Sequence, residues 1–411
     1  MVTAIDDDAI GALRSERLDW RFKAIPVAAH GETVEDFLGA RPALAELGTP
    51  LLTLDEGALA HNVRLMADWT RDAGVRLSPH GKTTMAPQLW RRQLEAGAWG
   101  ITLANLPQLR VARAFGVRRL MLANSLLDPA GLAWMAGQLD GDPDLSFVSW
   151  VDSVRSVELM DQARRAARAQ RPMEVCVELG GLDGRTGVRD EEEALELADV
   201  VRKTGTLRLA GLAGYEGALA HDASEEGREA VDAYLRRVAA LYGRLAYETE
   251  TPIVTAGGSS YFDQVVDVLG GLDGAEVILR SGAYIIHDDG FYRRISPFAR
   301  GTGEERLRSA MHGWARVISR PEPGLALLDA GKRDLPFDEG LPEPQSVAAA
   351  TCVAMADQHT FLRGGRVEVG EIVKLGLSHP CTAMDKWQLI PVLDDAGAES
   401  PVVVDLIRTW F

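Results

Sequence analysis

The sequence predicts an α/β fold, a (β/α)8 barrel of the TIM type with a smaller, mostly β domain after it. Between about residues 48 and 285, short apolar runs alternate with longer amphipathic stretches, which indicates a parallel sheet covered by helices. After Arg300 the apolar runs are short, rich in Val and Leu, and separated by Gly, Pro and Asp, as in a β-rich domain. We therefore expect an N-terminal extension over 1–47, a barrel over 48–300 and a β domain over 301–411.

The barrel strands are predicted from the apolar runs of the alternating region. Eight or nine such units favour a barrel over an open sheet. Since the barrel has eight strands, one of the nine apolar runs lies outside it, and periodicity does not say which run that is. Amphipathic stretches such as Met85–Ala96 and Val154–Ala169 supply covering helices. The predicted strands are Leu51–Asp55, Val75–Pro79, Gly100–Ala104, Leu120–Asn124, Phe147–Asp152, Glu174–Leu179, Leu209–Tyr215, Ile253–Ala256 and Val277–Arg280.

The two flanking parts of the chain give weaker signals. The extension is too short to fold alone, and we expect it to pack on the barrel or on the β domain. Within the barrel region, the acidic run Asp190–Glu193 predicts a solvated helix start, where carboxylates lie near the positive end of the helix dipole. Strands of the β domain are predicted within Leu307–Ile318, Gly324–Asp329, Gln345–Ala354, Arg366–Lys374 and Pro401–Leu406.

Composition restricts the class of protein. The 411 residues are 46 % hydrophobic and 25 % charged, and no apolar run reaches the roughly 18 residues of a membrane helix. The acidic N-terminus does not read as a signal peptide. Three cysteines do not form a disulfide framework, which favours a reducing cytoplasm. The net charge of -16 argues against a nucleic-acid or anionic-membrane partner, but not against a small zwitterionic substrate.

Lys82 is the first candidate for chemistry because of where it stands. It follows the predicted strand Val75–Pro79, whose pairing Pro79 ends, and Gly81 leaves room beside it. A lysine at the C-terminal rim of a barrel strand can be partly desolvated, which lowers its pKa and makes the amine a nucleophile towards aldehydes. The alternative is an ordinary surface lysine in a turn.

Small residues after two late strands predict an anion site on the same rim. Thr255–Ser260 precedes a helical run, and Leu279–Tyr284 follows one unit later, so both can present backbone N–H groups to a phosphate. Loops after the last strands of such barrels are a frequent phosphate site, although Gly-Gly-Ser-Ser alone is also a common tight turn.

Two further loops carry polar residues that can reach a ligand. The glycines of Gly180–Gly187 would let Arg185 turn back over the barrel mouth, and a surface arginine is the alternative. Tyr215 can stack on a planar ring. His221 can act as a general base, or as a histidine bonded to backbone at a helix start.

The β domain contains a candidate metal pair. In an extended segment, residues two apart point to the same side, so His379 and Cys381 could hold one ion. A thiolate and an imidazole suit zinc, and two protein ligands leave positions open for water or substrate. The alternative is a buried cysteine beside a capping histidine.

Together these elements resemble the D-serine dehydratase and D-threonine aldolase group of fold-type III pyridoxal-phosphate enzymes, which are related to alanine racemase. The resemblance covers about residues 48–400. Its most specific parts are Pro79-His80-Gly81-Lys82-Thr83 and His379-Pro380-Cys381, and the motifs around Arg185, Tyr215 and Gly257 occur in the expected order.

The resemblance implies a role for each of these residues. Lys82 would hold pyridoxal phosphate covalently, Tyr215 would lie close to its ring, and His80 and Arg185 would line the pocket. His221 matches the proposed base of the aldolases. His379 and Cys381 match the metal pair of the dehydratases, with Zn2+ expected and Mn2+ as the alternative ion. The phosphate would be held by Gly257, Gly258, Ser259, Gly282 and Ala283.

The function implied is a metal-assisted dehydratase that converts D-serine, or a related β-hydroxy D-amino acid, into a 2-oxo acid and ammonia. The alternative enzyme is a D-threonine aldolase, and a non-catalytic pyridoxal-phosphate carrier is the alternative of another class. Relatives pair as homodimers, so we expect a homodimer by analogy. The substrate side chain, the metal and the role of Lys332-Arg333-Asp334 stay open, and Met85 and Ser259-Ser260-Tyr261 depart from the family pattern.

Overall fold

A computed structural model describes residues 4–182, 184–301 and 303–411, and the chain divides into two compact units. The barrel unit comprises Ala67–Lys82 and Gln93–Gly282 with a few N-terminal residues. The β unit comprises Asp6–Met66, Thr83–Arg92 and Ala283–Phe411. Each unit is built from separate stretches of chain, and the linear boundaries predicted from the sequence stay predictions.

The barrel unit contains an eight-stranded parallel sheet in the order β2-β9-β8-β7-β6-β5-β4-β3. Its two end strands are joined by backbone hydrogen bonds, from Trp99 N–H to the Leu77 carbonyl (2.7 Å) and from Thr102 N–H to the Pro79 carbonyl (2.9 Å). The predicted barrel is thereby confirmed. The strands are β2 (Arg76–Leu77), β3 (Ile101–Leu103), β4 (Arg119–Leu122), β5 (Ser146–Val151), β6 (Met173–Leu179), β7 (Leu207–Gly214), β8 (Ile253–Ala256) and β9 (Glu276–Leu279).

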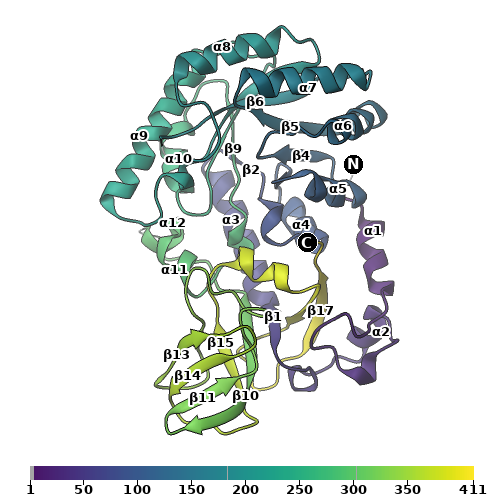
Figure 1. Cartoon of the computed structure of the whole chain (residues 1–411), viewed down its shortest axis with the longest axis vertical. Coiled ribbons are helices and arrows are strands. Elements are labelled where there is room, and N and C mark those ends of the chain that lie inside the picture. The colour runs from purple at the N-terminus through teal and green to yellow at the C-terminus, as the bar shows by residue number, and fades with distance from the viewer. Residues whose placement is uncertain (1–3, 183, 302) are drawn as a thin grey trace. The chain divides into compact units, whose positions relative to one another are not determined.

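Helices alternate with these strands and lie around their outside (Figure 1). Side chains begin several of them: the Ser153 hydroxyl accepts from a first-turn N–H, and Asp190 accepts from Glu192 and Glu193 N–H, which confirms the predicted acidic helix start. Side chains from β4 to β9 form a buried apolar cluster. The helices are α5 (Leu106–Ala114), α6 (Pro129–Gly141), α7 (Val154–Ala166), α8 (Glu191–Arg202), α9 (Glu225–Tyr242) and α10 (Phe262–Leu269).

The surplus apolar run of the sequence is β1 (Leu51–Asp55), which belongs to the β unit. It pairs antiparallel with β10 (Met311–Glu322) and parallel with β16 (Leu389–Leu393). Leu51, Leu52 and Leu54 are fully buried there. Because β1 is covered on both faces, its sequence has the continuous apolar character of a parallel barrel strand.

The β unit is a mostly antiparallel sheet in the order β13-β14-β11-β10-β1-β16-β17, with β15 paired to β10 and β12 (Figure 1). This confirms the predicted β-rich domain. Short turns join β10 to β11 and β13 to β14, as the Gly and Pro spacing indicates, whereas longer stretches of chain separate the strands of the other pairs. Its remaining strands are β11 (Leu325–Leu328), β12 (Glu343–Pro344), β13 (Ala350–Met355), β14 (Thr360–Gly364), β15 (Ile372–Gly376) and β17 (Val403–Arg408).

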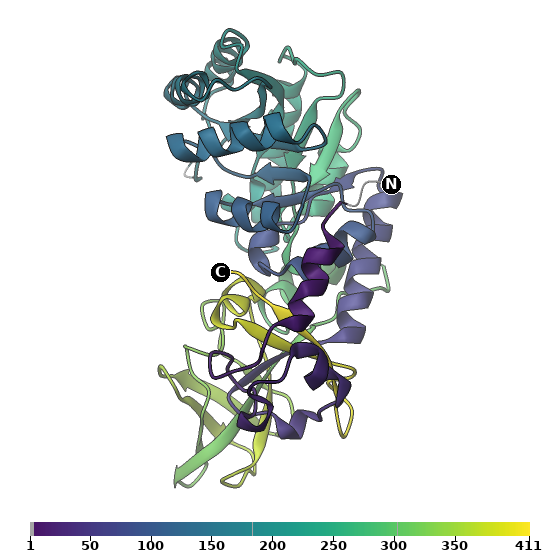
Figure 2. The same cartoon turned by 90° about the vertical axis from the view of Figure 1, so that its right-hand side faces the viewer.

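The N-terminal segment packs within the β unit. The short helices α1 (Asp7–Gly11) and α2 (Val34–Gly39) precede β1, and α2 packs against β17 (Figure 2). The buried side chains of this cluster are Leu18, Phe22, Ile25, Ala29, Val34, Phe37, Leu47, Leu51, Leu389, Leu393, Ala396, Val403 and Leu406.

Four helices remain to be described. The unit boundary falls within α3 (Glu56–Asp72) and α4 (Pro87–Glu95), while α11 (Phe291–Ile295) and α12 (Pro297–Arg300) precede β10 in the β unit. Among the described residues, no helix is long and apolar enough to cross a bilayer.

Candidate active site

The predicted site residues are divided between the two units. The chain passes from one unit to the other between Lys82 and Thr83, and again between Gly282 and Ala283. The β unit therefore holds Ala283, His379 and Cys381. The barrel unit holds His80, Lys82, Arg185, Tyr215, His221, Gly257, Gly258, Ser259 and Gly282.

Lys82 is half-buried in the loop that follows the barrel strand β2. Ser78 N–H donates to the Leu279 carbonyl of β9, and the Thr102 hydroxyl donates to the Ser78 carbonyl (2.7 Å), which fixes the chain before the lysine. The chain then turns into a single 3-10 turn over Gly81–Thr83. The position at the strand's C-terminal end is the one that the sequence predicts.

Basic side chains gather around His80. Burial is the main reason that the pKa of His80 lies well below its usual value, and the nearby positive charges of Lys82, Arg280 and Arg185 lower it further. The His80 Nδ1 atom is buried without a hydrogen-bond partner among the described residues. This part of the barrel unit therefore contains three cations beside the buried carboxylates of Glu216 and Glu178, and the cations can attract an anionic ligand.

Arg280, which sequence reasoning left unassigned, is the most buried of these cations. Its guanidinium donates to the Thr255 hydroxyl (2.7 Å) and the Gly214 carbonyl (2.6 Å), and lies 5.7 Å from the Trp150 ring centroid. Burial lowers the pKa of Arg280, while nearby carboxylates, first that of Glu216, oppose the shift. These contacts hold a fixed positive charge at the C-terminal ends of β7, β8 and β9.

The glycine loop after β8 is held by a buried carboxylate. Glu216 Oε2 accepts from Gly257 N–H (2.9 Å), and Glu216 Oε1 accepts from Gly258 N–H (2.7 Å). Gly257 has a φ of +90°, which favours glycine. Two of the amides predicted for phosphate binding are thus bonded to Glu216, which is fully buried. Glu216 stands in the Tyr215-Glu216-Gly217 motif, but its role was not predicted.

The second predicted anion segment makes a close backbone approach. A Cβ on Gly282 would lie 2.4 Å from the His80 carbonyl oxygen, so a larger residue would displace one of the two segments. Gly282 is therefore required for the loop after β9 to pack beside the loop after β2. This places Gly282 next to His80, as the shared barrel rim predicts.

Arg185 and Tyr215 also come together. The Arg185 guanidinium lies 4.3 Å from the Tyr215 ring centroid, in a cation–π contact, and a Cβ on Gly258 would lie 3.1 Å from Tyr215 Cε2. The loop that carries Arg185 also includes residue 183, which lies outside the described residues. His221 is exposed in the loop before α9, and its role as a base stays a prediction.

The metal pair lies on a turn, not on the extended segment that the sequence predicts. His379 has a φ of +62°, and Pro380–Thr382 form a 3-10 turn. The expectation of an extended strand was wrong because Pro380 starts this turn and leaves no ladder to continue β15. Buried Asp288 accepts from His379 N–H at 2.8 Å, which holds the unusual backbone conformation.

His379 and Cys381 interact despite this change. Burial alone would lower the pKa of His379, but hydrogen bonding and charge from Cys381, together with Asp338, raise it to about 9. Cys381 Sγ lies 3.3 Å from the Thr83 hydroxyl. In the described part of the chain, no group of three or more His, Cys, Asp and Glu side chains is arranged to hold a metal ion. The imidazole and the thiol are each of a ligand type that binds zinc.

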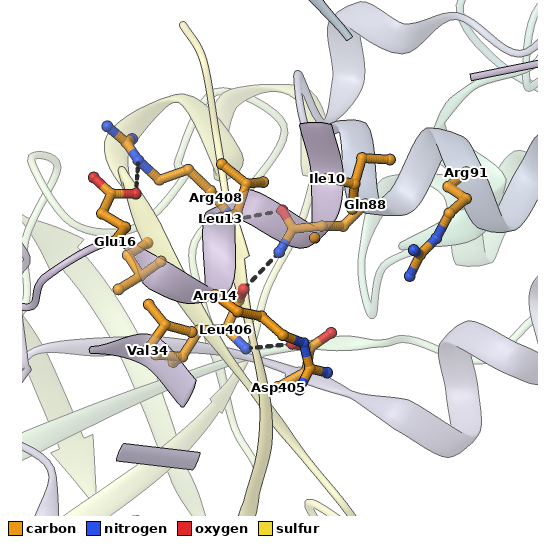
Figure 3. Close-up of a pocket in the computed structure, with 12 residues that line it drawn as sticks. Ile10, Leu13, Arg14, Glu16, Val34, Gln88, Arg91, Asp405, Leu406 and Arg408 are labelled. Carbon is orange, nitrogen blue, oxygen red and sulfur yellow. Dashed lines mark hydrogen bonds and ion pairs between the residues drawn. The ribbon is translucent and has the colours of Figure 1, made fainter. Parts of the chain in front are cut away.

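A small cavity elsewhere in the β unit contains none of the predicted site residues. It has a volume of about 50 Å³ and lies between the N-terminal segment, α4 and β17 (Figure 3). Arg408 donates to Glu16 (3.1 Å), and Gln88 donates to the Leu406 carbonyl (2.7 Å). These bonds attach the N-terminal segment and α4 to β17, so the cavity reflects packing between these elements.

Comparisons with known proteins show which family the chain belongs to. The model "Alanine racemase, N-terminal domain" matches residues 54–265, and "Putative serine dehydratase domain" matches residues 310–393. The D-threonine aldolase of Arthrobacter sp is 30% identical over 344 residues, covering 82% of this chain and 86% of that protein. The D-threo-3-hydroxyaspartate dehydratase of Delftia sp. is 27% identical, covering 72% and 75%.

A solved structure supports the same family assignment. The crystal structure of D-threonine aldolase from Filomicrobium marinum has a TM-score of 0.78 and 27% identity, covering 90% of this chain and 97% of that chain. The fold and these relatives therefore define a fold-type III pyridoxal-phosphate lyase. Within that class, the chain belongs to the family that includes D-threonine aldolase and D-serine dehydratase.

The residues present fit pyridoxal phosphate. A half-buried lysine supplies an amine for the cofactor aldehyde, and the surrounding cations Arg280 and Arg185 suit its negative charge. Gly282, with no room for a Cβ, brings a second glycine loop beside His80. Glu216 already engages Gly257 and Gly258 N–H, which leaves the predicted phosphate contacts of Ser259, Gly282 and Ala283 to be tested.

Proposed function

We propose that the protein is a lyase of β-hydroxy D-amino acids and that its main reaction is dehydration of D-serine or a close relative. The observation that carries the proposal is the gathering of Lys82, Arg280 and Arg185 around half-buried His80 at the C-terminal end of the barrel strands. The family match to dehydratases and aldolases of such substrates supports it.

The barrel unit would supply binding and proton transfer. Pyridoxal phosphate, when bound, withdraws electrons from the Cα atom of an amino acid joined to it. The Lys82 amine would hold the cofactor and then, once released, take the α-proton. Arg280 keeps a fixed charge at the base of the site through Thr255 and Gly214. Arg185, stacked on Tyr215, is placed to attract a carboxylate.

The β unit would supply the group that makes hydroxide leave. His379 and Cys381 would hold a divalent metal, with zinc preferred, and that metal would supply Lewis acidity towards the β-hydroxyl. Loss of water from D-serine, followed by hydrolysis, gives pyruvate and ammonium, so water is released once and consumed once. The cysteine at position 381 and the serine dehydratase match over residues 310–393 support dehydration as the main reaction.

Retro-aldol cleavage is the second candidate reaction. It is favoured by the similarity to two D-threonine aldolases, at 30% and 27% identity over most of the chain. That reaction needs a base that removes the proton of the β-hydroxyl, and His221 is the predicted base. Its exposed position before α9 does not by itself support that role.

Product analysis separates these candidates. The purified protein, supplied with pyridoxal phosphate and zinc, is incubated with D-serine, D-threonine and D-threo-3-hydroxyaspartate, and with L-serine as a control. A 2-oxo acid with ammonia supports the dehydratase, whereas glycine with an aldehyde or with glyoxylate supports the aldolase. Cofactor binding without product from any D-amino acid would favour a non-catalytic carrier and contradict the proposal.

Two statements about the whole protein are part of the proposal. We expect a homodimer in the cytoplasm, by analogy with relatives and from the cysteine content. Light scattering coupled to gel filtration tests the oligomeric state, and a monomer at working concentration would contradict it.

A further inference from the structure

An acidic side chain far along the sequence contacts the imidazole of the candidate metal pair. Asp338 lies in the loop between β11 and β12, and its Oδ2 atom is 2.6 Å from His379 Nδ1. The two residues are separated by 41 positions in the sequence. A hydrogen bond at Nδ1 leaves Nε2 as the ring nitrogen available to a metal.

Asp338 is itself held in place. Its other oxygen, Oδ1, accepts from the Thr382 hydroxyl at 2.7 Å, and Thr382 belongs to the same turn as Cys381. The Ser378 hydroxyl donates to the Glu339 carbonyl (2.9 Å), which gives the loop and the turn a second connection. Asp338 can therefore fix the ring of His379 relative to the turn that carries Cys381.

The backbone of His379 is fixed by a different carboxylate. Asp288 accepts from His379 N–H (2.8 Å) and also from Gly290 and Tyr292 N–H. Asp288 thus sets the position of the main chain, while Asp338 sets the orientation of the ring. Ring orientation decides whether Nε2 and the Cys381 thiolate can bind one ion at the same time.

We propose that Asp338 is a positioning residue for the metal: it holds His379 through Nδ1 so that Nε2 and Cys381 act as a bidentate donor pair. The inference rests on the proposed metal-assisted function. A carboxylate behind a ligating histidine fixes the ring and raises the basicity of the ligating nitrogen, and its loss typically weakens metal binding by ~10–100-fold. With His379 and Cys381 as the two donors in the described part of the chain, metal binding depends strongly on that orientation.

The test measures zinc affinity without turnover. The cofactor-loaded protein competes with a chromophoric zinc chelator, and the dissociation constant is compared for wild type, Asp338→Asn and Asp338→Glu. We expect Asp338→Asn to bind zinc ~10–100-fold more weakly, and Asp338→Glu, which keeps the charge, to recover part of that loss. The matched control is Asp385→Asn, which removes a nearby carboxylate that pairs with Lys386 at 3.8 Å; its zinc affinity stays at the wild-type value.

A second variant separates orientation from charge. Thr382→Val keeps the carboxylate but removes the hydroxyl that fixes Oδ1, so zinc affinity falls if orientation matters. Circular dichroism and the cofactor absorbance show whether each variant is folded. Zinc affinity of folded Asp338→Asn within about threefold of wild type would overturn the inference and leave the proposed function intact. If wild-type protein binds no zinc or manganese, both the inference and the metal-assisted reaction fail.

Discussion

Glu216 Oε1 accepts a hydrogen bond from the backbone N–H of Gly258 at 2.7 Å. The same carboxylate accepts from Gly257 N–H, so one buried side chain bonds both glycines of the loop after β8. Buried amides without acceptors are costly, and a carboxylate that accepts two of them is a strong constraint on loop shape. Glu216 therefore shapes the loop that the sequence assigns to the cofactor phosphate.

Removal of this carboxylate is expected to weaken both the fold and the binding of the cofactor. Glu216→Ala leaves two amides unsatisfied and is predicted to lower the free energy of unfolding by about 2–3 kcal/mol, measured by urea denaturation of the cofactor-free protein. The dissociation constant for pyridoxal phosphate should rise at least about tenfold, which corresponds to about 1.4 kcal/mol. Glu229→Ala, on the exposed face of α9, is the control. Unchanged stability in Glu216→Ala would show that the loop does not depend on Glu216.

Loss of the Cys381 thiol is expected to weaken metal binding without weakening cofactor binding. Cys381→Ala should keep the absorbance of bound pyridoxal phosphate but lower zinc affinity and turnover of D-serine by about 100-fold or more, because one of two protein donors is lost. Cys352→Ala removes another thiol of the β unit and should leave both unchanged. Full turnover by Cys381→Ala, with zinc removed by chelation, would exclude the metal from the reaction.

Two buried histidines of the β unit predict loss of stability in acid. Burial is the main cause that lowers the pKa of His287 and of His312 to about 4, from 6.5. In the unfolded chain both bind a proton at higher pH than in the folded protein. Stability is therefore fully present above about pH 6.5 and falls as the pH drops towards 4, by up to about 3 kcal/mol for each histidine.

A comparison of variants isolates this effect from other titrating groups. His312→Gln should reduce by about half the part of the pH dependence of the unfolding free energy between pH 4 and 6.5 that comes from the two histidines, measured by urea denaturation at several pH values. His359→Gln, at a half-buried position in the same unit, is the control for replacing a histidine. A wild-type slope in His312→Gln would mean that His312 is not responsible.

The sequence predicted the barrel well because its strands are short apolar runs that alternate with longer helical stretches, most of them amphipathic. Runs such as Ile253–Ala256 coincide with the observed strand. The same signal could not assign Leu51–Asp55 to the correct sheet. A strand buried on both faces has the same continuous apolar sequence in the barrel sheet and in the sheet of the β unit. Sheet membership of β1 is decided by its pairing with β10 and β16, which are distant in sequence.

Part of the candidate site follows from motifs, and part depends on contacts that motifs do not contain. Lys82 and Gly282 lie where their strand ends predict. Asp338 was missed because the loop Pro336–Gly340 reads as a solvated turn, and its partner His379 is 41 positions away. The turn at Pro380 was misread as a strand because alternation over three residues is too short to define one.

The most direct test of the account is to locate the lysine that carries the cofactor. The protein loaded with pyridoxal phosphate is reduced with borohydride, digested and analysed by mass spectrometry. The account predicts that the reduced cofactor is attached to Lys82 and that Lys82→Ala neither retains the yellow absorbance nor is labelled. Attachment to any other lysine (Lys23, Lys203, Lys332, Lys374 or Lys386), or yellow absorbance retained by Lys82→Ala, would contradict it.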